Sequence, residues 1–155
     1  MRKNPMKVRN HFKTITPEVD IVTANTTIEV IIQIISRNPA SRSVFVIDQD
    51  ERLIGVISTK DVLQILGAKY LRKRTVFVLH EILAITAADI MREAESVGPD
   101  DDLEQALRIA VVHNMEDIPV VENNKVIGNL DCFELIKGIS AQKRIEQRER
   151  YDSSG

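Results

Sequence analysis

The sequence contains few of the residues on which disulfide-stapled folds and aromatic cores depend. Of its 155 residues, one is cysteine, none is tryptophan and only 4% are aromatic. Because Cys132 is the only cysteine, no disulfide can form within the chain. The core must therefore come from aliphatic residues. Val and Ile are plentiful, which is typical of mixed α and β structure.

Long hydrophobic runs and an excess of positive charge are also missing. No apolar run is long enough to span a bilayer, and the first residues do not have the pattern of a signal peptide. The net charge of -2 disfavours a general nucleic-acid binder. We therefore expect a soluble, cytoplasmic protein that binds neither membrane nor nucleic acid, with one compact domain or two very small ones.

Recognisable catalytic motifs are missing as well. The sequence has no Walker loop and no catalytic Ser or Cys signature, and no set of nucleophile, base and acid can be assembled from it. His11, His80 and His113 do not have the close spacing of metal ligands. We therefore expect no enzyme activity, no catalytic cofactor and no metal site.

The sequence does contain one order of elements twice. The first copy has an extended piece, a helix, two strands joined by a polar turn, and a short helix: Ile21–Thr23, a helix opened by a capping box at Thr26–Glu29, Val44–Ile47, Leu53–Ile57, and a helix from Val62 to Leu66. The second copy has the same order: Ser96–Gly98, a helix opened at Asp101–Glu104, Ile118–Val121, Val126–Leu130, and a helix from Leu135 to Ile139. One such copy is too small to bury both faces of its sheet. The repeat predicts an α+β fold in which two β-α-β-β-α repeats pack as a pseudo-twofold pair.

The two copies resemble tandem CBS domains, a family named after cystathionine β-synthase and also called a Bateman module. The resemblance rests on Gly55-Val-Ile-Ser-Thr-Lys-Asp61, which fits the family signature Gly-apolar-x-Ser/Thr-x-x-Asp, and on Ile118-Pro-Val-Val121 and Asp89-Ile-Met91. It implies a first repeat at residues 8–67, a linker at 68–87 that we expect to be helical, a second repeat at 88–140, and a charged tail or helix at 141–155.

Ser58 and Asp61 have two interpretations. They can simply cap the helix that follows, because a Ser at the N-cap and an acid in the first turn satisfy free N–H groups. They can also bind a ligand there, because a helix start favours an anion. The resemblance implies AMP, ADP or ATP in the cleft between the repeats, with Ser58 on a phosphate and Asp61 on the ribose. Apolar strand residues would enclose the adenine. The whole predicted site is Val22, Thr23, Val44, Phe45, Gly55, Ile57, Ser58, Lys60 and Asp61.

The second repeat has acids at both motif positions. Asp131 and Glu134 still form a good capping box, but a carboxylate at position 131 repels a phosphate. We predict that this degenerate second site is empty, needs a bridging cation, or accepts an adenosyl ligand without a phosphate, such as S-adenosylmethionine. A hydroxyl at position 131 is expected to restore nucleotide binding. The predicted residues are Val97, Ile118, Pro119, Asp131 and Glu134.

The linker leaves a further choice open. Val76, Leu79, Ile82 and Leu83 have the spacing of one helical face, and the basic residues before them are Arg72, Lys73 and Arg74. The linker is interpreted as a bridging helix with these basic residues in solvent, and the alternative is that one of them reaches a ligand phosphate.

The favoured hypothesis for function is a regulatory module that senses an adenine nucleotide. The alternative is a protein–protein interaction or dimerisation module without a physiological nucleotide. The resemblance also implies a homodimer, and a regulated partner protein is compatible with either hypothesis. The sequence identifies neither the nucleotide nor the regulated process.

Overall fold

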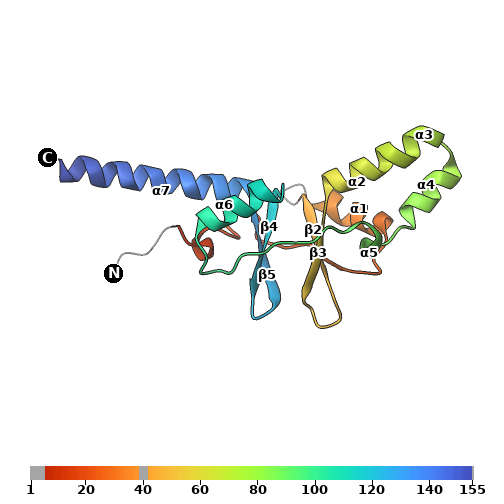
Figure 1. The fold of residues 1–155 in the computed structure, drawn as a ribbon, viewed down its shortest axis with the longest axis horizontal. Helices are drawn as coiled ribbons and strands as arrows, with labels where there is room; N and C mark the ends of the chain where they lie inside the picture. The colour runs from red at the N-terminus through yellow and green to blue at the C-terminus, as the bar shows by residue number, and fades with distance from the viewer. Residues whose placement is uncertain (1–5, 39–41, 155) are drawn as a thin grey trace. The chain divides into compact units, whose positions relative to one another are not determined.

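The computed structural model describes residues 6–38 and 42–154 (Figure 1). The chain divides into two compact units that alternate along the sequence. The first-repeat unit consists of Val19–Ala94 with Asn123–Val126. The second-repeat unit consists of the chain up to Glu18, Glu95–Glu122, and the chain from Ile127 onward. Each repeat therefore folds together with a segment that is distant in sequence.

The first-repeat unit is built on a three-stranded sheet. Its strands are β1 (Ile21–Thr23), β2 (Ser43–Ile47) and β3 (Leu53–Ser58), in the order β1-β2-β3. Strand β1 runs parallel to β2, and β3 runs antiparallel to it. The polar turn between β2 and β3 is organised by Asp48, whose Oδ1 accepts hydrogen bonds of 2.9 Å from the N–H groups of Asp50 and Arg52. This turn confirms the hairpin that the sequence predicts.

Helices α1 (Ile28–Arg37) and α2 (Thr59–Ile65) cover one face of this sheet. Alternate residues of a strand point to the same face, so Val44 and Val46 both reach this side. The core on this face consists of Val22, Ile28, Ile31, Val44, Val46, Ile57, Val62 and Ala87. Its aliphatic composition follows from the scarcity of aromatic residues in the chain.

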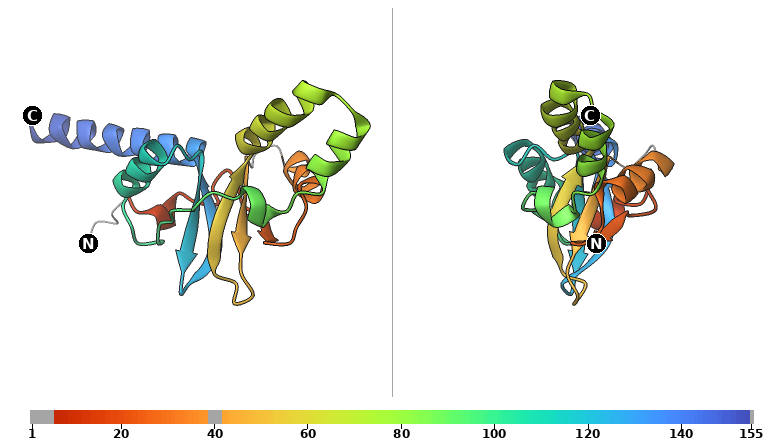
Figure 2. Two further views of the ribbon diagram at one scale, coloured as in Figure 1. Left: turned by 45° about the vertical axis from the view of Figure 1, so that its right-hand side comes forward. Right: turned by 90° about the vertical axis from the view of Figure 1, so that its right-hand side faces the viewer.

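The segment between the repeats forms a helical hairpin, which we define as Leu66–Leu83. Its outgoing arm consists of the π-helix η2 (Leu66–Tyr70) and α3 (Leu71–Lys73), which continue directly from α2 (Figure 2). The chain reverses at Arg74, whose φ of 45° is left-handed, and α4 (Val76–Leu83) returns alongside the first arm. A short helix, α5 (Ala87–Ile90), follows.

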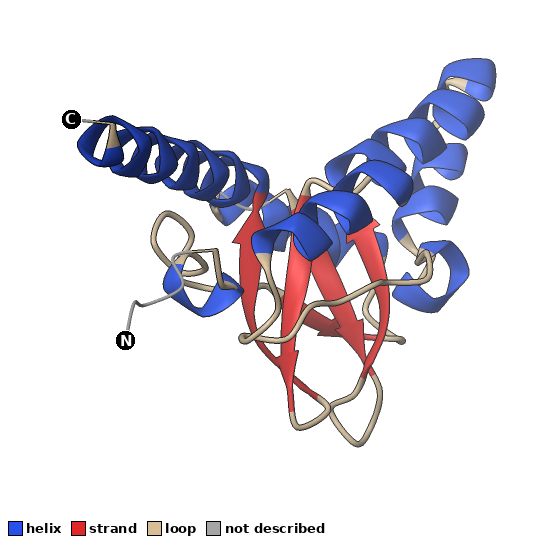
Figure 3. Cartoon of the chain, turned by 60° about the vertical axis from the view of Figure 1, so that its left-hand side comes forward, coloured by secondary structure: helices blue, strands red, loops and turns tan. Residues whose placement is uncertain are grey.

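The second-repeat unit contains η1 (Val8–Asn10), α6 (Leu103–Val112), β4 (Asp117–Glu122), β5 (Lys125–Asp131) from Ile127 onward, and α7 (Cys132–Ser153). Figure 3 shows that α7 continues well beyond the strands of its own unit. Although α7 has 22 residues, its second half is mainly charged. Across residues 6–38 and 42–154, no helix is both long enough and apolar enough to span a bilayer.

Three local predictions were wrong. The helix cap of α1 is Thr27 instead of Thr26, whose Oγ1 accepts a hydrogen bond of 3.2 Å from the N–H of Thr23. The cap of α6 is Asp102 instead of Asp101, whose carboxylate accepts one of 2.7 Å from the N–H of Gly98. In both cases the predicted cap residue stabilises the turn before the helix. The piece around Val97 forms a single-residue parallel bridge with Val120 instead of a strand.

Helix α5 has a cap that was not predicted from the sequence. The N–H of Thr86 donates a hydrogen bond of 3.0 Å to the carboxylate of Asp89, which holds the pKa of Asp89 below its ordinary value. A carboxyl group whose pKa is lower in the folded than in the unfolded state stabilises the fold at pH values above its unfolded-state pKa. This stabilisation is lost as the pH falls through its folded-state pKa. Asp89, part of the Asp89-Ile-Met91 piece that resembles the family, is therefore a capping residue.

A strand glycine in each unit allows a side chain from a segment distant in sequence to approach the backbone. A Cβ on Gly55 would lie 2.7 Å from the sulfur of Met91 and 2.9 Å from its Cβ. A Cβ on Gly128 would lie 2.5 Å from a ring carbon of Phe12. Neither glycine has a positive φ, so the requirement is for space and not for backbone freedom.

We therefore expect Gly55→Ala to destabilise the protein, because the added methyl group must displace Met91. Overpacking of this kind costs about 1–3 kcal/mol in free energy of unfolding. Gly67→Ala is the matched control, since a Cβ at Gly67 meets nothing within 4 Å. Because Ala is favoured over Gly inside a helix, we expect Gly67→Ala to raise the free energy of unfolding by about 0.5–1 kcal/mol. Urea unfolding measures the free energy of unfolding of both variants. Equal free energies for Gly55→Ala and Gly67→Ala would contradict the packing role of Gly55.

Candidate functional site

The junction between β3 and α2 places Ser58 and Asp61 together. The Oγ of Ser58 accepts a hydrogen bond of 3.1 Å from the N–H of Asp61, and the Asp61 carboxylate accepts one of 2.9 Å from the N–H of Ser58. This reciprocal arrangement confirms the predicted capping box. Both residues are half-buried. The serine hydroxyl accepts in the cap, so its own hydrogen is still available for a ligand.

Arg92 adds a positive charge to this junction. Its Nε lies 3.1 Å from both carboxylate oxygens of Asp61. The backbone of Arg92 is fixed by two hydrogen bonds of 2.9 Å with Val56 in β3. Arg92 was not among the predicted site residues. The available signal was its position directly after Asp89-Ile-Met91, the piece that marks the start of the second repeat.

A pocket of about 370 Å³ opens beside these residues. We call it the motif pocket, and its lining is Asp61, Gln64, Ile65, Ala68, Lys69, Ile90 and Arg92. Two cations and one carboxylate line it, so its charge favours an anion. Lys69 is the linker cation in this lining, whereas Arg72, Lys73 and Arg74 are not part of it.

The other predicted residues of the first site lie apart from the motif pocket. Val44 pairs with Ile57 across the sheet, and both point with Val22 into the core under α1 and α2. Phe45 is fully buried and faces the opposite side of the sheet. Thr23 is exposed and bonded to Thr26, and Lys60 is exposed in the first turn of α2. The structure therefore brings Ser58 and Asp61 together with Gly55 near the end of β3, and it uses the core residues to support them.

The corresponding junction of the second repeat, between β5 and α7, has the same backbone geometry. The N–H of Asp131 donates to the Glu134 carboxylate at 3.0 Å, and the N–H of Glu134 donates to the Asp131 carboxylate at 2.8 Å. The capping box predicted here is confirmed. Both acids are almost completely buried, with 2% and 1% of their surface exposed. This junction is therefore much less accessible than its counterpart.

The segment Thr14–Thr16 closes the second junction. The second carboxylate oxygen of Glu134 accepts hydrogen bonds from the N–H of Ile15 at 3.0 Å and of Thr16 at 3.4 Å. The hydroxyl of buried Thr16 donates to the free carboxylate oxygen of Asp131. The chain itself thus uses the acceptors that a ribose would need.

The remaining predicted residues of the second site form a backbone bridge. The N–H of Val97 donates to the carbonyl of Pro119 at 3.0 Å, and Val97, Ile118 and Pro119 are all buried. They therefore provide structural support near the start of β4.

Comparison with known proteins gives the context for this geometry. A CBS domain-containing protein from Thermotoga maritima is 28% identical, with a TM-score of 0.73 over 86% of this chain and 94% of that one. The crystal structure of CBSX2 in complex with AMP is 22% identical, with a TM-score of 0.67 over 88% of this chain and 98% of that one. A Methanocaldococcus jannaschii protein, proposed as an archaeal homologue of γ-AMPK, is 25% identical, with a TM-score of 0.67 over 79% of this chain and 45% of that one.

The comparison with curated proteins gives no match. The family model of the CBS domain matches two segments, residues 1–68 and 85–141. These segments contain the two glycine-marked hairpins and the capping boxes that follow them. The chain therefore belongs to the CBS-domain family and carries two copies of the domain in tandem.

Proposed function

We propose that this chain is a regulatory module that binds an adenine nucleotide (AMP, ADP or ATP) at the motif pocket of the first repeat. The observation that carries the proposal is that Asp61, Arg92 and Lys69 line one pocket, with Ser58 hydrogen-bonded to Asp61 beside it. The binding of AMP by CBSX2, a protein of similar fold, also supports it. We expect the module to act in the cytoplasm, and its regulated partner to be another protein.

Each group has a distinct part in this proposal. The hydroxyl of Ser58 donates to a phosphate oxygen, and the carboxylate of Asp61 accepts hydrogen bonds from the ribose hydroxyls. Arg92 holds Asp61 in place without ligand and supplies a charged donor beside the phosphate, as does Lys69. Charge-assisted hydrogen bonds of this kind are stronger than neutral ones. The buried side chains of Val22, Val44 and Ile57 support the motif from the core instead of contacting adenine.

Regulation requires that the nucleotide bind one state of the protein more tightly than another. Arg92 and Lys69 are suited to transmit such a preference. Arg92 is bonded through its backbone to β3, and Lys69 belongs to the helical hairpin. A phosphate that attracts both cations would stabilise one arrangement of the hairpin relative to the sheet of its own unit.

A second candidate function, a dimerisation module, is favoured by exposed apolar side chains. Leu63 on α2 is 66% exposed, and Ile136 on α7 is 63% exposed. The two residues occupy the same position relative to Ser58 and Asp131. A homodimer that covers these helices is compatible with nucleotide sensing, and without nucleotide binding it would be the main function.

The Ser58→Asp variant separates capping from nucleotide binding. Asp is an equally good N-cap, and Asp131 already occupies this position in the second repeat, so the variant should melt close to the parent. It should lose more than tenfold in affinity for AMP or ATP, since a charged hydrogen bond of about 1.5–3 kcal/mol is lost and a repulsion is added. Calorimetry measures the affinity. Parent-like binding would remove Ser58 from the site.

Asp131→Thr tests the second repeat. From the sequence, this change is expected to restore a nucleotide site. The structure leads to a different expectation, because Thr14–Thr16 still covers Glu134 and its acceptors. We expect the titration to show one nucleotide per chain, as in the parent. Two nucleotides per chain would mean that Thr14–Thr16 moves aside readily.

The dimer prediction is tested by sedimentation at micromolar concentration. We expect the parent to be a homodimer and the double variant Leu63→Asp/Ile136→Asp to be a monomer, because both changes put charge on the exposed apolar positions. Gln64→Asp is the matched control on the same helix and should stay dimeric. A monomeric parent would refute the interface, and so would a dimeric double variant.

A further inference from the structure

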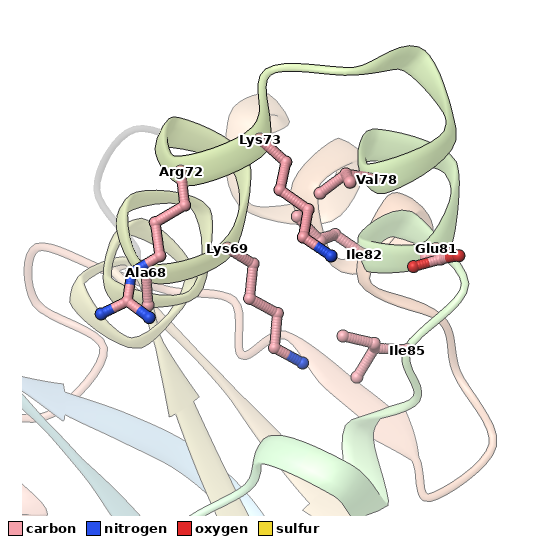
Figure 4. A pocket seen from close by; sticks show the side chains of 8 residues that line it. All are labelled: Ala68, Lys69, Arg72, Lys73, Val78, Glu81, Ile82 and Ile85. Carbon is pink, nitrogen blue, oxygen red and sulfur yellow. The ribbon is translucent and has the colours of Figure 1, made fainter.

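A second pocket lies between the arms of the helical hairpin. It has a volume of about 380 Å³, and we call it the hairpin pocket (Figure 4). Its lining consists of Ala68, Lys69, Arg72, Lys73, Val78, Glu81, Ile82 and Ile85. Ala68 and Lys69 also line the motif pocket, whereas the other residues of the hairpin pocket do not. This volume is at the lower end of the range for small-molecule sites, which is roughly 300–1,000 Å³.

The two arms contribute different chemistry to the hairpin pocket. The returning arm and the residues after it supply an apolar wall of Val78, Ile82 and Ile85. The outgoing arm supplies cations, and Figure 4 shows the side chains of Lys69 and Lys73 extending into the space between the arms. The pocket therefore has an apolar side and a cationic side.

The positive charge of the hairpin pocket is not balanced. The lining contains three cations, Lys69, Arg72 and Lys73, and one acid, Glu81. Within residues 6–38 and 42–154, none of these three cations forms a salt bridge. All three cations are exposed, so an anionic partner can reach them and would be attracted by their charge.

The backbone of the outgoing arm is also unusual. Leu66–Tyr70 is π-helical, and this turn carries both Ala68 and Lys69. π-helical turns are rare and frequently occur at functional sites, because the wider turn redirects side chains. Here the wider turn supplies residues to both the hairpin pocket and the motif pocket.

We propose that the hairpin pocket binds a small amphiphilic anion, with one carboxylate or phosphate head group and a short hydrocarbon tail. The head group lies between Lys69 and Lys73, and the tail packs on Val78, Ile82 and Ile85. This site is separate from the nucleotide site that we propose at the motif pocket, and its ligand needs no base or ribose.

An anionic membrane surface is the competing partner. The turn of the hairpin exposes Leu71, Val76 and Phe77, with 59%, 75% and 82% of their surface accessible, beside the basic residues Arg72–Arg74. The hairpin pocket favours a single amphiphile, because the amines of Lys69 and Lys73 lie between the arms (Figure 4). Both sources share the same head-group chemistry, so the experiment must distinguish them.

Calorimetry on the full chain tests the proposal with octanoate and octyl phosphate, below their micelle concentrations. We expect at least one of them to bind with one molecule per chain. Octylamine and inorganic phosphate should bind at least tenfold more weakly, since the first lacks the negative charge and the second the tail. Octylamine binding as tight as that of the anions, or no binding of either anion, would overturn the proposal.

Variants locate the bound anion. Lys73→Gln should weaken its binding about tenfold or more, and Lys69→Gln/Lys73→Gln should weaken it further. Arg74→Gln is the matched control, because Arg74 belongs to the same basic run and does not line the pocket. All three substituted positions are exposed, and thermal melts establish that each variant is folded. Unchanged anion binding in the double variant would overturn the proposal.

Two further measurements separate the alternatives. Lys73 lines the hairpin pocket and does not line the motif pocket, so Lys73→Gln should leave AMP affinity unchanged. A failure of the nucleotide site would leave the octanoate result intact. Cosedimentation with phosphatidylglycerol vesicles, compared with Phe77→Ser, tests the membrane surface. Vesicle binding that depends on Phe77, without binding of either monomeric anion, would overturn the proposal in favour of a membrane partner.

Discussion

A side chain that presses against a strand glycine organises each half of this protein. Met91 packs on Gly55, and Phe12 packs on Gly128, at distances that leave no room for a Cβ. A sheet of two or three strands cannot bury both of its faces alone, so a segment from elsewhere in the chain must cover it. In the first-repeat unit this segment carries Met91 and, next to it, Arg92. The contact that closes the sheet therefore also sets Arg92 beside Asp61.

The two repeats share one local geometry at the start of a helix but differ in whether it is accessible to a ligand. Ser58 with Asp61 and Asp131 with Glu134 form the same reciprocal cap at the start of a helix. The first cap borders a pocket with two cations, whereas the second is buried and its acceptors are taken by Thr14–Thr16. An acid at position 131 has a partner in the hydroxyl of Thr16, which accounts for a buried carboxylate at that position. The cap is thus structural in both repeats, and it is free for a ligand only in the first.

The helical hairpin places a second pocket next to the motif pocket. Ala68 and Lys69 line both, on a π-helical turn that interrupts an otherwise continuous arm. A negative charge in either pocket would be felt by the same ammonium group, so ligands in the two pockets would affect one another's affinity. Such coupling is reciprocal by thermodynamic necessity. The hairpin is therefore the part of the first-repeat unit in which the nucleotide binding that we propose would be combined with a second ligand signal.

The sequence by itself determined the tandem repeat, the two hairpins and the caps at Ser58 and Asp131, because these depend on residues that are close along the chain. It did not determine the caps at Thr27 and Asp102, because Thr26 and Asp101 compete for the preceding turn with the same chemistry. Tertiary structure alone decided that Arg92 and Lys69 lie at the motif, that the adjacent arms of the hairpin enclose a pocket, and that Thr14–Thr16 covers the second junction. These features join residues that are distant in sequence, and their placement depends on packing that no local pattern records.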